Sequence, residues 1–452
     1  METLLPESFY QQLRSSVLTK LSTDPGYFVS IVYKTSLIGY PISSPFFPTD
    51  DPTLCLITDI KNHPNPNLTL SKLAEQGKIG IIYLLSTQGS DYILKKTTFS
   101  PSISYKNGPE TSLEALTNSD TAMQLCNFPT NLTDYNFIGC DEFTNETLIA
   151  YILEFIFNYY RLSSAGMNTF LKHHLGFICK SQGYNLMEYA DLGTLNRIGT
   201  NPLWSNYRHS LLVNNKLIEV VYPDVILNIF KQVISTLHFL QTTVFFTSSD
   251  CKTANIFIKS DPITVNYNNL IINSPFTCKI GDYGKASLSI NLTNKNLPHR
   301  IFNKEWRSSQ YLSVAPFHPH INEIDGIPFY VISNLTMAQF YTRSRHMGIP
   351  YYLSFDTYTF IISFLHDPAV FHSFFNNDIF RLHLWPSLWF PDDIDNIFSR
   401  IHHNIIKHIP GSYTVIVELL MGIKLKCNLT SLLLDTLITV NTMFPISSTN
   451  LY

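Results

Sequence analysis

Apolar residues recur at helical spacing in several parts of the chain. The clearest stripe, over residues 224–240, predicts an amphipathic helix with Asp224 at its start, and its apolar positions are Val225, Ile226, Ile229, Phe230, Val233, Ile234, Leu237 and Leu240. A second helix is predicted over 145–160, with Asn145 or Thr144 as its cap. Residues 356–366 are apolar on every side, which predicts a buried helix.

Short β-favouring runs between polar turns predict strands elsewhere. Residues 79–85 and 92–95 flank a turn and predict a β-hairpin. Two more strands are expected near 177–179 and 184–189. Strand-like patches return over 256–280 around polar turns, and the stretch from Asp261 to Pro275 predicts a hairpin. The pattern as a whole predicts an α+β fold, with a small β-rich part followed by a larger, mainly helical part.

Composition excludes several classes of protein. The chain has 452 residues, of which 45% are hydrophobic and 14% charged, so a mainly disordered chain is excluded. The formal net charge of −3 leaves no basic excess, and no nucleic-acid partner is expected. No uninterrupted apolar run reaches the roughly 20 residues of a membrane-spanning helix. The first residues are acidic and do not resemble a signal peptide.

The cysteine count argues against disulfides and zinc. There are seven cysteines, an odd number, and no C-x-x-C pair. A reducing compartment such as the cytoplasm therefore fits best.

Two features near residue 80 suit phosphate binding. Gly77 and Gly80 precede a strand, and glycines allow a loop backbone to lie close to phosphates. An ordinary hairpin turn is the alternative. Lys95 ends the next strand and has the reach to contact nucleotide phosphates. Lys96 is adjacent and points to the opposite face, so one of the two lysines is expected to be solvated.

Two later motifs supply carboxylates. Asp250, Lys252 and Asn255 lie within six residues, and together they offer a proton acceptor, a cation and an oxygen ligand for Mg²⁺. Asp282 leaves a strand into Tyr283-Gly284, where a carboxylate suits Mg²⁺ between phosphates. Each motif alone also fits an ordinary polar turn.

The order of these motifs resembles that of the eukaryotic-type protein kinases. Gly77 and Gly80 match two glycines of the family's Gly-rich loop, and Lys95 matches its strand lysine. The catalytic-loop pattern H-R-D-x-K-x-x-N is matched by Asp250, Lys252 and Asn255, and D-F-G is matched from Asp282 onward.

Other segments fall in the expected order between these motifs. Glu146 stands where the family carries the partner of the strand lysine, with Glu154 as the fallback. The hinge that holds adenine is matched near Met187, the gatekeeper, with the Glu188 carbonyl and the Ala190 backbone as adenine contacts. The apolar helix around Asp356 resembles the buried helix that anchors the second lobe.

The resemblance implies a bilobal fold and a reaction. Residues 1–70 would form an N-terminal extension, 71–190 a β-rich N-lobe, and 191–452 a mainly helical C-lobe with a long activation segment. ATP and Mg²⁺ are the implied cofactors, and the implied acceptor is a Ser/Thr hydroxyl of a protein substrate. Lys95 and Glu146 would form the ion pair that holds phosphate, Asp250 and Lys252 would serve the transfer, and Mg²⁺ would lie on Asn255 and Asp282.

The sequence also departs from the family. Glu75 replaces the first loop glycine, and Ser248-Ser249 replaces the His-Arg before Asp250. The missing arginine would pair with a phosphorylated activation loop, so control by such phosphorylation is not expected. Ala315-Pro316-Phe317 lacks the glutamate of A-P-E. The basic run 343–346 suits an acidic substrate or a solvated loop.

These departures leave alternatives to an active protein kinase. One is a pseudokinase that acts as a scaffold, and another is a kinase of small molecules or lipids on the same fold. The divergent motifs and the high content of Asn, Ile, Phe and Tyr resemble those of protein kinases from large nucleocytoplasmic DNA viruses. This resemblance implies the host cytoplasm or the virion as the location. The pattern gives no oligomeric state.

Overall fold

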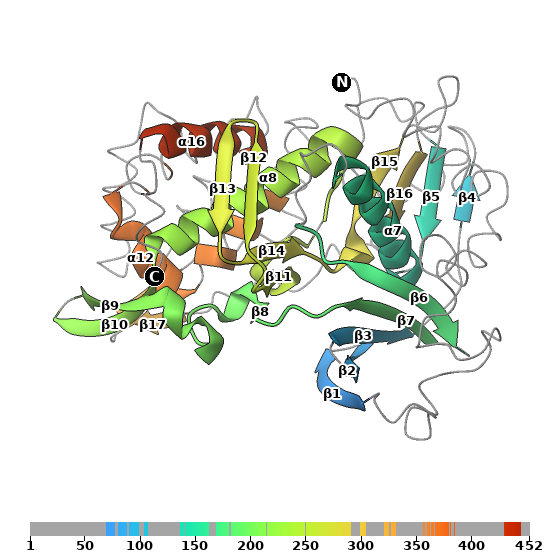
Figure 1. The fold of residues 1–452 in the computed structure, drawn as a ribbon, viewed down its shortest axis with the longest axis horizontal. Helices are drawn as coiled ribbons and strands as arrows, with labels where there is room; N and C mark the ends of the chain where they lie inside the picture. Colours follow the sequence, from blue (N-terminus) through green and yellow to red (C-terminus); the bar gives the residue numbers. More distant parts are fainter. Residues whose placement is uncertain are drawn as a thin grey trace.

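The protein is an α+β molecule with antiparallel sheets and a strand-rich N-terminal region (Figure 1). The computed structural model describes residues 69–76, 80–87, 90–98, 104–106, 136–140, 142–161, 169–179, 182–213, 215–248, 250–290, 299–303, 321–324 and 327–330, most of 356–380, residue 384 and residues 429–443.

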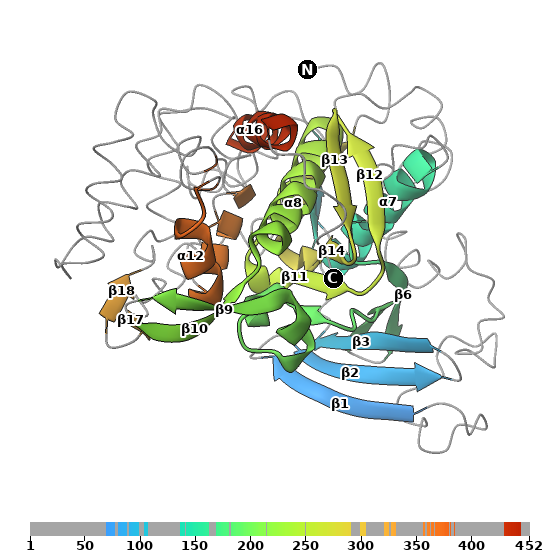
Figure 2. The ribbon, with the colours of Figure 1, turned by 60° about the vertical axis from the view of Figure 1, so that its left-hand side comes forward.

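A five-stranded antiparallel sheet forms one side of the molecule, at the bottom of Figure 2. Its strands, in spatial order, are β1 (Thr69–Gln76), β2 (Gly80–Thr87), β3 (Ser90–Thr98), β7 (Gln182–Glu188) and β6 (His173–Cys179). The predicted hairpin of residues 79–95 is confirmed as β2 and β3, and the two later predicted strands are confirmed as β6 and β7.

Strand β1 was not predicted. It pairs antiparallel with β2 at the edge of the sheet, and a bulge lies between Lys72 and Ala74. An edge strand has no neighbour on one side and needs no apolar alternation. Leu73 is 50% exposed, so the usual period-2 signal is missing from this stretch.

Helix α7 (Glu142–Arg161) contacts the sheet at β6 and through Phe143. The predicted helix is confirmed, but it begins three residues earlier than expected. Asn145 and Thr144 therefore lie inside the first turns, and the prediction that one of them caps the helix is wrong. Gly183 on β7 faces the ring of Phe143, and a Cβ there would lie 2.5 Å from Cδ2 of that ring. This close approach fixes the distance between α7 and the sheet.

Helix α8 (Pro223–Val244) confirms the clearest sequence prediction and forms the centre of the second region. Its apolar stripe is buried. The long helix runs obliquely in Figure 1 and steeply near the centre of Figure 2. Phe230 contacts the rings of Phe360, Phe364 and Phe374, of which the last lies on α12 (Pro368–Phe375). The described residues from 356 to 365 are helical and mostly buried, as predicted. Helix α16 (Leu429–Met443) also packs on α8, and Lys231 of α8 donates to the Asn441 side chain at 2.6 Å.

Two antiparallel strand pairs follow α8 in the sequence, and the loops that contain Asp250 and Asp282 adjoin the first pair. Strands β11 (Ile256–Lys259) and β14 (Thr277–Ile280) pair antiparallel, and β8 (Gly193–Thr194) joins β11. Between them the predicted long hairpin is confirmed as β12 (Ile263–Tyr267) and β13 (Leu270–Ser274). The Gln232 side chain of α8 bonds the backbone of Phe276 and Cys278, which fixes β14 on the helix.

A four-stranded sheet brings together distant parts of the chain. Its strands, in spatial order, are β15 (Ser287–Ile290), β16 (His299–Asn303), β5 (Asn136–Cys140) and β4 (Ser104–Lys106). Strand β16 runs parallel to β5, which leads directly into α7. Periodicity carries no information about which strands pair, so the sequence did not predict this sheet.

The described residues after residue 190 include strands as well as helices. Among them are the hairpins β9 (Arg208–Val213) with β10 (Lys216–Val221) and β17 (Ile321–Ile324) with β18 (Ile327–Tyr330). Leu212 and Leu217 are exposed on the first hairpin, and apolar residues on its solvent side hide the alternation that marks a strand. Among the described residues, no helix combines the length and apolar character needed to cross a bilayer.

Gly183→Ala is expected to lower the free energy of unfolding by about 1 to 3 kcal/mol, because its methyl group would overlap the Phe143 ring in a packed interior. Urea unfolding followed by circular dichroism measures the change. Ile271→Ala, at a residue 54% exposed on β13, serves as the control and is expected to change stability by less than about 0.5 kcal/mol. Equal stability of Gly183→Ala and the unsubstituted protein would contradict the packing argument.

Candidate active site

Lys95 lies on a central strand of the five-stranded sheet. It pairs with Ile82 of β2 on one side and with Asn185 of β7 on the other. Its side chain is buried, whereas Lys96 points to the other face and places its ammonium 5.9 Å from the centre of the Tyr184 ring. The two neighbouring lysines therefore separate as the period of a strand requires.

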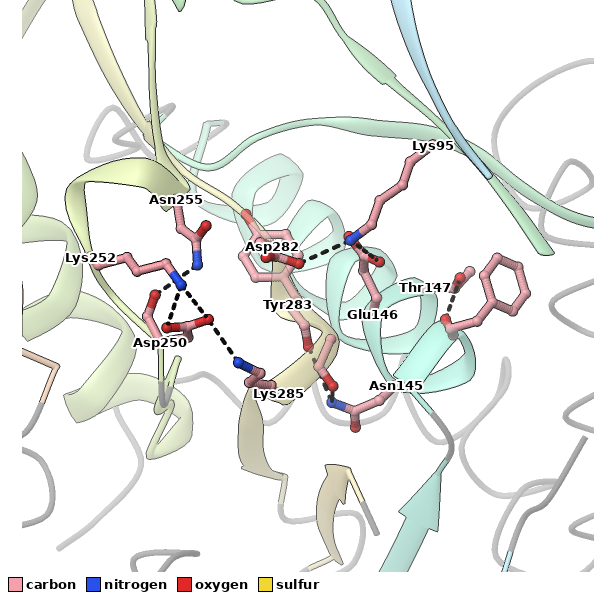
Figure 3. Close-up of polar contacts among 12 residues, drawn as sticks. Lys95, Asn145, Glu146, Thr147, Asp250, Lys252, Asn255, Asp282, Tyr283 and Lys285 are labelled. Atoms are coloured by element: carbon pink, nitrogen blue, oxygen red, sulfur yellow. Dashed lines mark hydrogen bonds and ion pairs between the residues drawn. The ribbon is translucent and has the colours of Figure 1, made fainter. Parts of the chain in front are cut away.

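The ammonium of Lys95 contacts two carboxylates from distant parts of the chain. Its Nζ lies 2.9 Å from Oε2 and 3.1 Å from Oε1 of Glu146 on α7, and 2.9 Å from Oδ1 of Asp282 (Figure 3). The fallback residue, Glu154, is instead paired with Lys172 at 3.5 Å. Three of the sequence-predicted residues thus meet at one point.

Burial and charge oppose each other at this contact. Burial alone would lower the pKa of Lys95, but the carboxylates of Asp282 and Glu146 outweigh it and hold that pKa above its usual value. Burial likewise acts to raise the pKa of Asp282, and the Lys95 ammonium reverses the effect, so the Asp282 pKa is lowered. Lys95 and Asp282 are therefore both charged near neutral pH.

The backbone at Asp282 has an unusual conformation. Its φ of 59° and ψ of 69° lie in the left-handed region, which aspartate tolerates better than most residues. Asp282 follows the end of β14, and this turn directs its carboxylate back toward Lys95. Sparsely populated backbone conformations of this kind often occur where function fixes a side chain.

The loop of Asp250 lies beside Asp282. Lys252 Nζ lies 3.1 Å from Oδ1 and 3.2 Å from Oδ2 of Asp250. The side chain of Asn255 donates through Nδ2 to the backbone carbonyl of Asp250 at 2.8 Å, and the backbone carbonyl of Asn255 accepts from the N–H of Gly281 at 3.0 Å. The second of these bonds joins the Asp250 loop directly to the residue before Asp282.

Buried polar groups of the helix around residue 360 support this loop. Asp356 is fully buried and accepts a hydrogen bond from the backbone N–H of Ser248 at 2.6 Å. Ser363 accepts from the N–H of Thr253 at 2.9 Å. The buried segment around residue 360 therefore holds the chain just before this loop and again within it, and the sequence indicated this segment through Asp356.

The predicted hinge residues lie at the end of β7. Met187 is buried, and because it lies two residues from Asn185 its side chain shares the sheet face of Lys95. Ala190 accepts a hydrogen bond from Gly193 N at 3.0 Å, which closes a turn after the strand. The Glu188 carboxylate lies 3.1 Å from Lys279 Nζ on β14, so it ties the hinge to the strand that leads to Asp282.

The glycine motif is only partly described. Gly80 begins β2, where a Cβ would lie 2.3 Å from the Lys96 carbonyl oxygen, so the close approach of strands alone requires glycine there. Gly77, Ser249, residues 315–317 and the basic run 343–346 lie outside the described residues.

The sequence analysis missed three polar side chains at the site. Lys285 Nζ lies 3.0 Å from Asp250 Oδ2, as a second cation on that carboxylate. Asn145, expected as a cap, donates to backbone carbonyls that follow Asp282. Glu142 packs closely against Gly284: a Cβ added to that glycine would lie 2.7 Å from Glu142 Cγ. Lys285 could have been predicted from the sequence, because it directly follows Asp282-Tyr283-Gly284. The sequence around Asn145 and Glu142 contains no pattern that predicts their contacts.

Comparison with known proteins gives a distant match. No family model matches the chain. A protein of Acanthamoeba polyphaga mimivirus named "Putative serine/threonine-protein kinase R679" is 28% identical over 251 residues. The match covers 51% of this chain and 31% of that protein, so it spans less than a third of the relative's length. The similarity supports a kinase-like protein.

Glu142 predicts a pH dependence of stability. Burial raises its pKa from 4.5 to about 7. A carboxyl group with a higher pKa in the folded than in the unfolded state is destabilising once it must ionise, so stability falls as the pH rises from about 4.5 through about 7. Glu142→Gln removes this penalty and is expected to gain on the order of 2 kcal/mol more at pH 8 than at pH 5.

Urea unfolding of Glu142→Gln at both pH values measures this difference. Ile271→Ala, at an exposed residue of β13 that carries no titratable group, is the control and should change stability by the same amount at both pH values. A gain for Glu142→Gln that does not depend on pH would contradict the assignment.

Proposed function

We propose that this chain is a protein kinase that transfers the γ-phosphate of Mg·ATP to Ser/Thr hydroxyls of protein substrates. One observation carries the proposal: the Lys95 ammonium bridges Glu146 and Asp282, next to the Asp250 loop (Figure 3). A cation, a metal-binding carboxylate and a proton acceptor are the groups that phosphoryl transfer requires. The similarity to the mimivirus protein adds independent support for a kinase-like function.

In this proposal ATP binds between the five-stranded sheet and the Asp250 loop. Lys95 would contact the α- and β-phosphates, and Glu146 would keep its ammonium in place. Adenine would contact the Glu188 carbonyl and the Ala190 backbone, with Met187 behind it. In this proposal residues 71–190 and 191–452 would form two lobes with the nucleotide between them, and residues 1–70 would form an extension.

The donor set fits Mg²⁺. Asp282 uses Oδ1 for Lys95, and its side chain is still 34% exposed. The Nδ2 of Asn255 donates a hydrogen bond to the Asp250 carbonyl, so the amide oxygen of that side chain is the atom that could bind a metal ion. Mg²⁺ prefers oxygen ligands and often uses only one or two from the protein. Mg²⁺ on Asn255 and Asp282 would neutralise charge on the phosphates.

The remaining residues suit the transfer step. The acceptor hydroxyl oxygen would bond to the γ-phosphorus as the bond to the bridging oxygen of ADP breaks, and Asp250 would accept the hydroxyl proton. Lys252, held on the Asp250 carboxylate, would neutralise charge on the γ-phosphoryl group. Lysine two residues after Asp250 matches the Ser/Thr branch of the family, which supports a Ser/Thr acceptor.

Asp250→Asn is expected to reduce phosphate transfer by at least about 100-fold, because an amide cannot accept the proton. Asp282→Ala is expected to abolish transfer, because it removes a proposed metal ligand and one partner of Lys95. Transfer of labelled γ-phosphate from Mg·ATP to a generic Ser/Thr protein and to the chain itself measures both.

Controls separate chemistry from folding. Asp261→Asn changes a carboxylate that is 59% exposed and paired with Lys259, away from Lys95, and should leave transfer within about twofold of the unsubstituted protein. Unchanged activity of Asp282→Ala would refute the proposed role of that residue. Absence of transfer by the unsubstituted protein, with nucleotide-independent binding of a partner, would favour a scaffold.

A further inference from the structure

The side chain of Asn145 connects α7 to the segment that follows Asp282. Its Nδ2 lies 3.1 Å from the carbonyl oxygens of Tyr283 and Gly284 and 2.8 Å from that of Ala286 (Figure 3). Asn145 is fully buried, so water does not compete for these contacts. One amide thus organises the turn η8 (Tyr283–Lys285) and the residue after it.

The chemistry of the contact requires an amide nitrogen. Three carbonyl oxygens surround the terminal group, and all three can only accept hydrogen bonds. Placing the amide oxygen there would bring four acceptors together, which fixes the orientation of the amide. A carboxylate of the same shape would face the same three oxygens with a negative charge.

The same two segments are joined a second time through the backbone. Strand β15 follows η8 directly and pairs with β16, and β16 pairs in parallel with β5, the strand that leads into α7. At its other edge β15 is fixed by Ser287, which exchanges two backbone hydrogen bonds of 2.8 Å with Thr247 just before the Asp250 loop. Three segments therefore hold residues 282–290 in place.

The position of α7 decides whether Lys95 has its partner. Glu146 is the residue after Asn145, so a movement of this turn relative to η8 displaces the Glu146 carboxylate from the Lys95 ammonium, which also holds Asp282. Asn145 touches neither ion-paired group, and its effect on the site passes through the helix and the turn.

We propose that Asn145 is a positioning residue that anchors the segment after Asp282 to α7, so that the catalytic arrangement forms without a phosphate on this segment. The inference rests on the proposed kinase function for its catalytic consequence. Ser249 occupies the position directly before Asp250, where the family carries its arginine, and the anchoring described here uses only backbone carbonyls and one neutral amide. A phosphate-binding arginine has no part in it.

The first experiment compares Asn145→Ala and Asn145→Asp with the unsubstituted protein, all treated with phosphatase and checked by intact mass. The unsubstituted protein should transfer phosphate linearly from the first time point, at a rate within about twofold of the untreated sample. The variants should lose about 10- to 100-fold in kcat, because small displacements of catalytic groups cost that much. Their KM for ATP should change less than threefold, because the hinge on β7 is untouched.

Hydrogen–deuterium exchange supplies a readout that does not need activity. The N–H groups of Ala286 and Ser287 bond to the carbonyls of Tyr283 and Thr247. Both should exchange at least about tenfold faster in Asn145→Ala, whereas α8 should be unchanged. Ser235→Ala, which truncates a buried hydroxyl without a partner among the described residues, is the matched control and should alter neither exchange nor kcat.

The outcomes distinguish the inference from the proposed function. A lag before transfer, or transfer only after phosphate has been incorporated, would overturn independence from phosphorylation. Unchanged exchange at residues 286 and 287 in Asn145→Ala would overturn the anchoring role. If no sample transfers phosphate, the proposed function fails, and the exchange experiment still decides whether Asn145 anchors the segment.

Discussion

The contact between the Lys95 ammonium and the carboxylates of Glu146 and Asp282 is the interaction on which the site depends. Each partner comes from a different element: a central strand, a helix and the turn after β14. Removing charges from water costs several kcal/mol per ion, and close geometry repays this only while every partner is present. The three elements therefore hold one relative position, and a shift of any one leaves a buried charge without its counterpart.

The rest of the molecule fixes these elements from outside. Gly183 sets how closely α7 approaches the sheet, and Glu188 links the end of β7 to Lys279 on β14. Asp356 holds the chain at Ser248, before the Asp250 loop, from a buried helix. These contacts are mostly buried hydrogen bonds and ion pairs between segments far apart in sequence. The site is thus positioned by long-range polar contacts on an apolar core built around α8.

Much of the local structure could be predicted from the sequence, because it follows from periodicity. The stripe of α8 and the hairpin of β2 with β3 have strong patterns and were predicted as elements, although α8 continues four residues past the predicted end and both strands are longer than predicted. The candidate residues Lys95, Glu146 and Asp282 were found through the order of motifs, and the structure brings them together. Asn145 was assigned as a cap because asparagine before a helix is typical of one, and its long-range contacts leave no local signal. The parallel pairing of β16 with β5 was hidden for the same reason.

That parallel pairing has a consequence for how the protein acquires its structure. Strand β5 and α7 leave the ribosome before the Asp250 loop, and β16 follows only after Asp282. Contacts between such distant segments form slowly, because closing the long loop between them costs conformational entropy before the contacts stabilise the structure. During synthesis, the edge of β5 that pairs with β16 therefore has no partner until β16 has been made. The contact of Lys95 with Asp282 joins residues 187 positions apart, so it forms only after Asp282 has been synthesised, and a chain that stops before Asp282 lacks it.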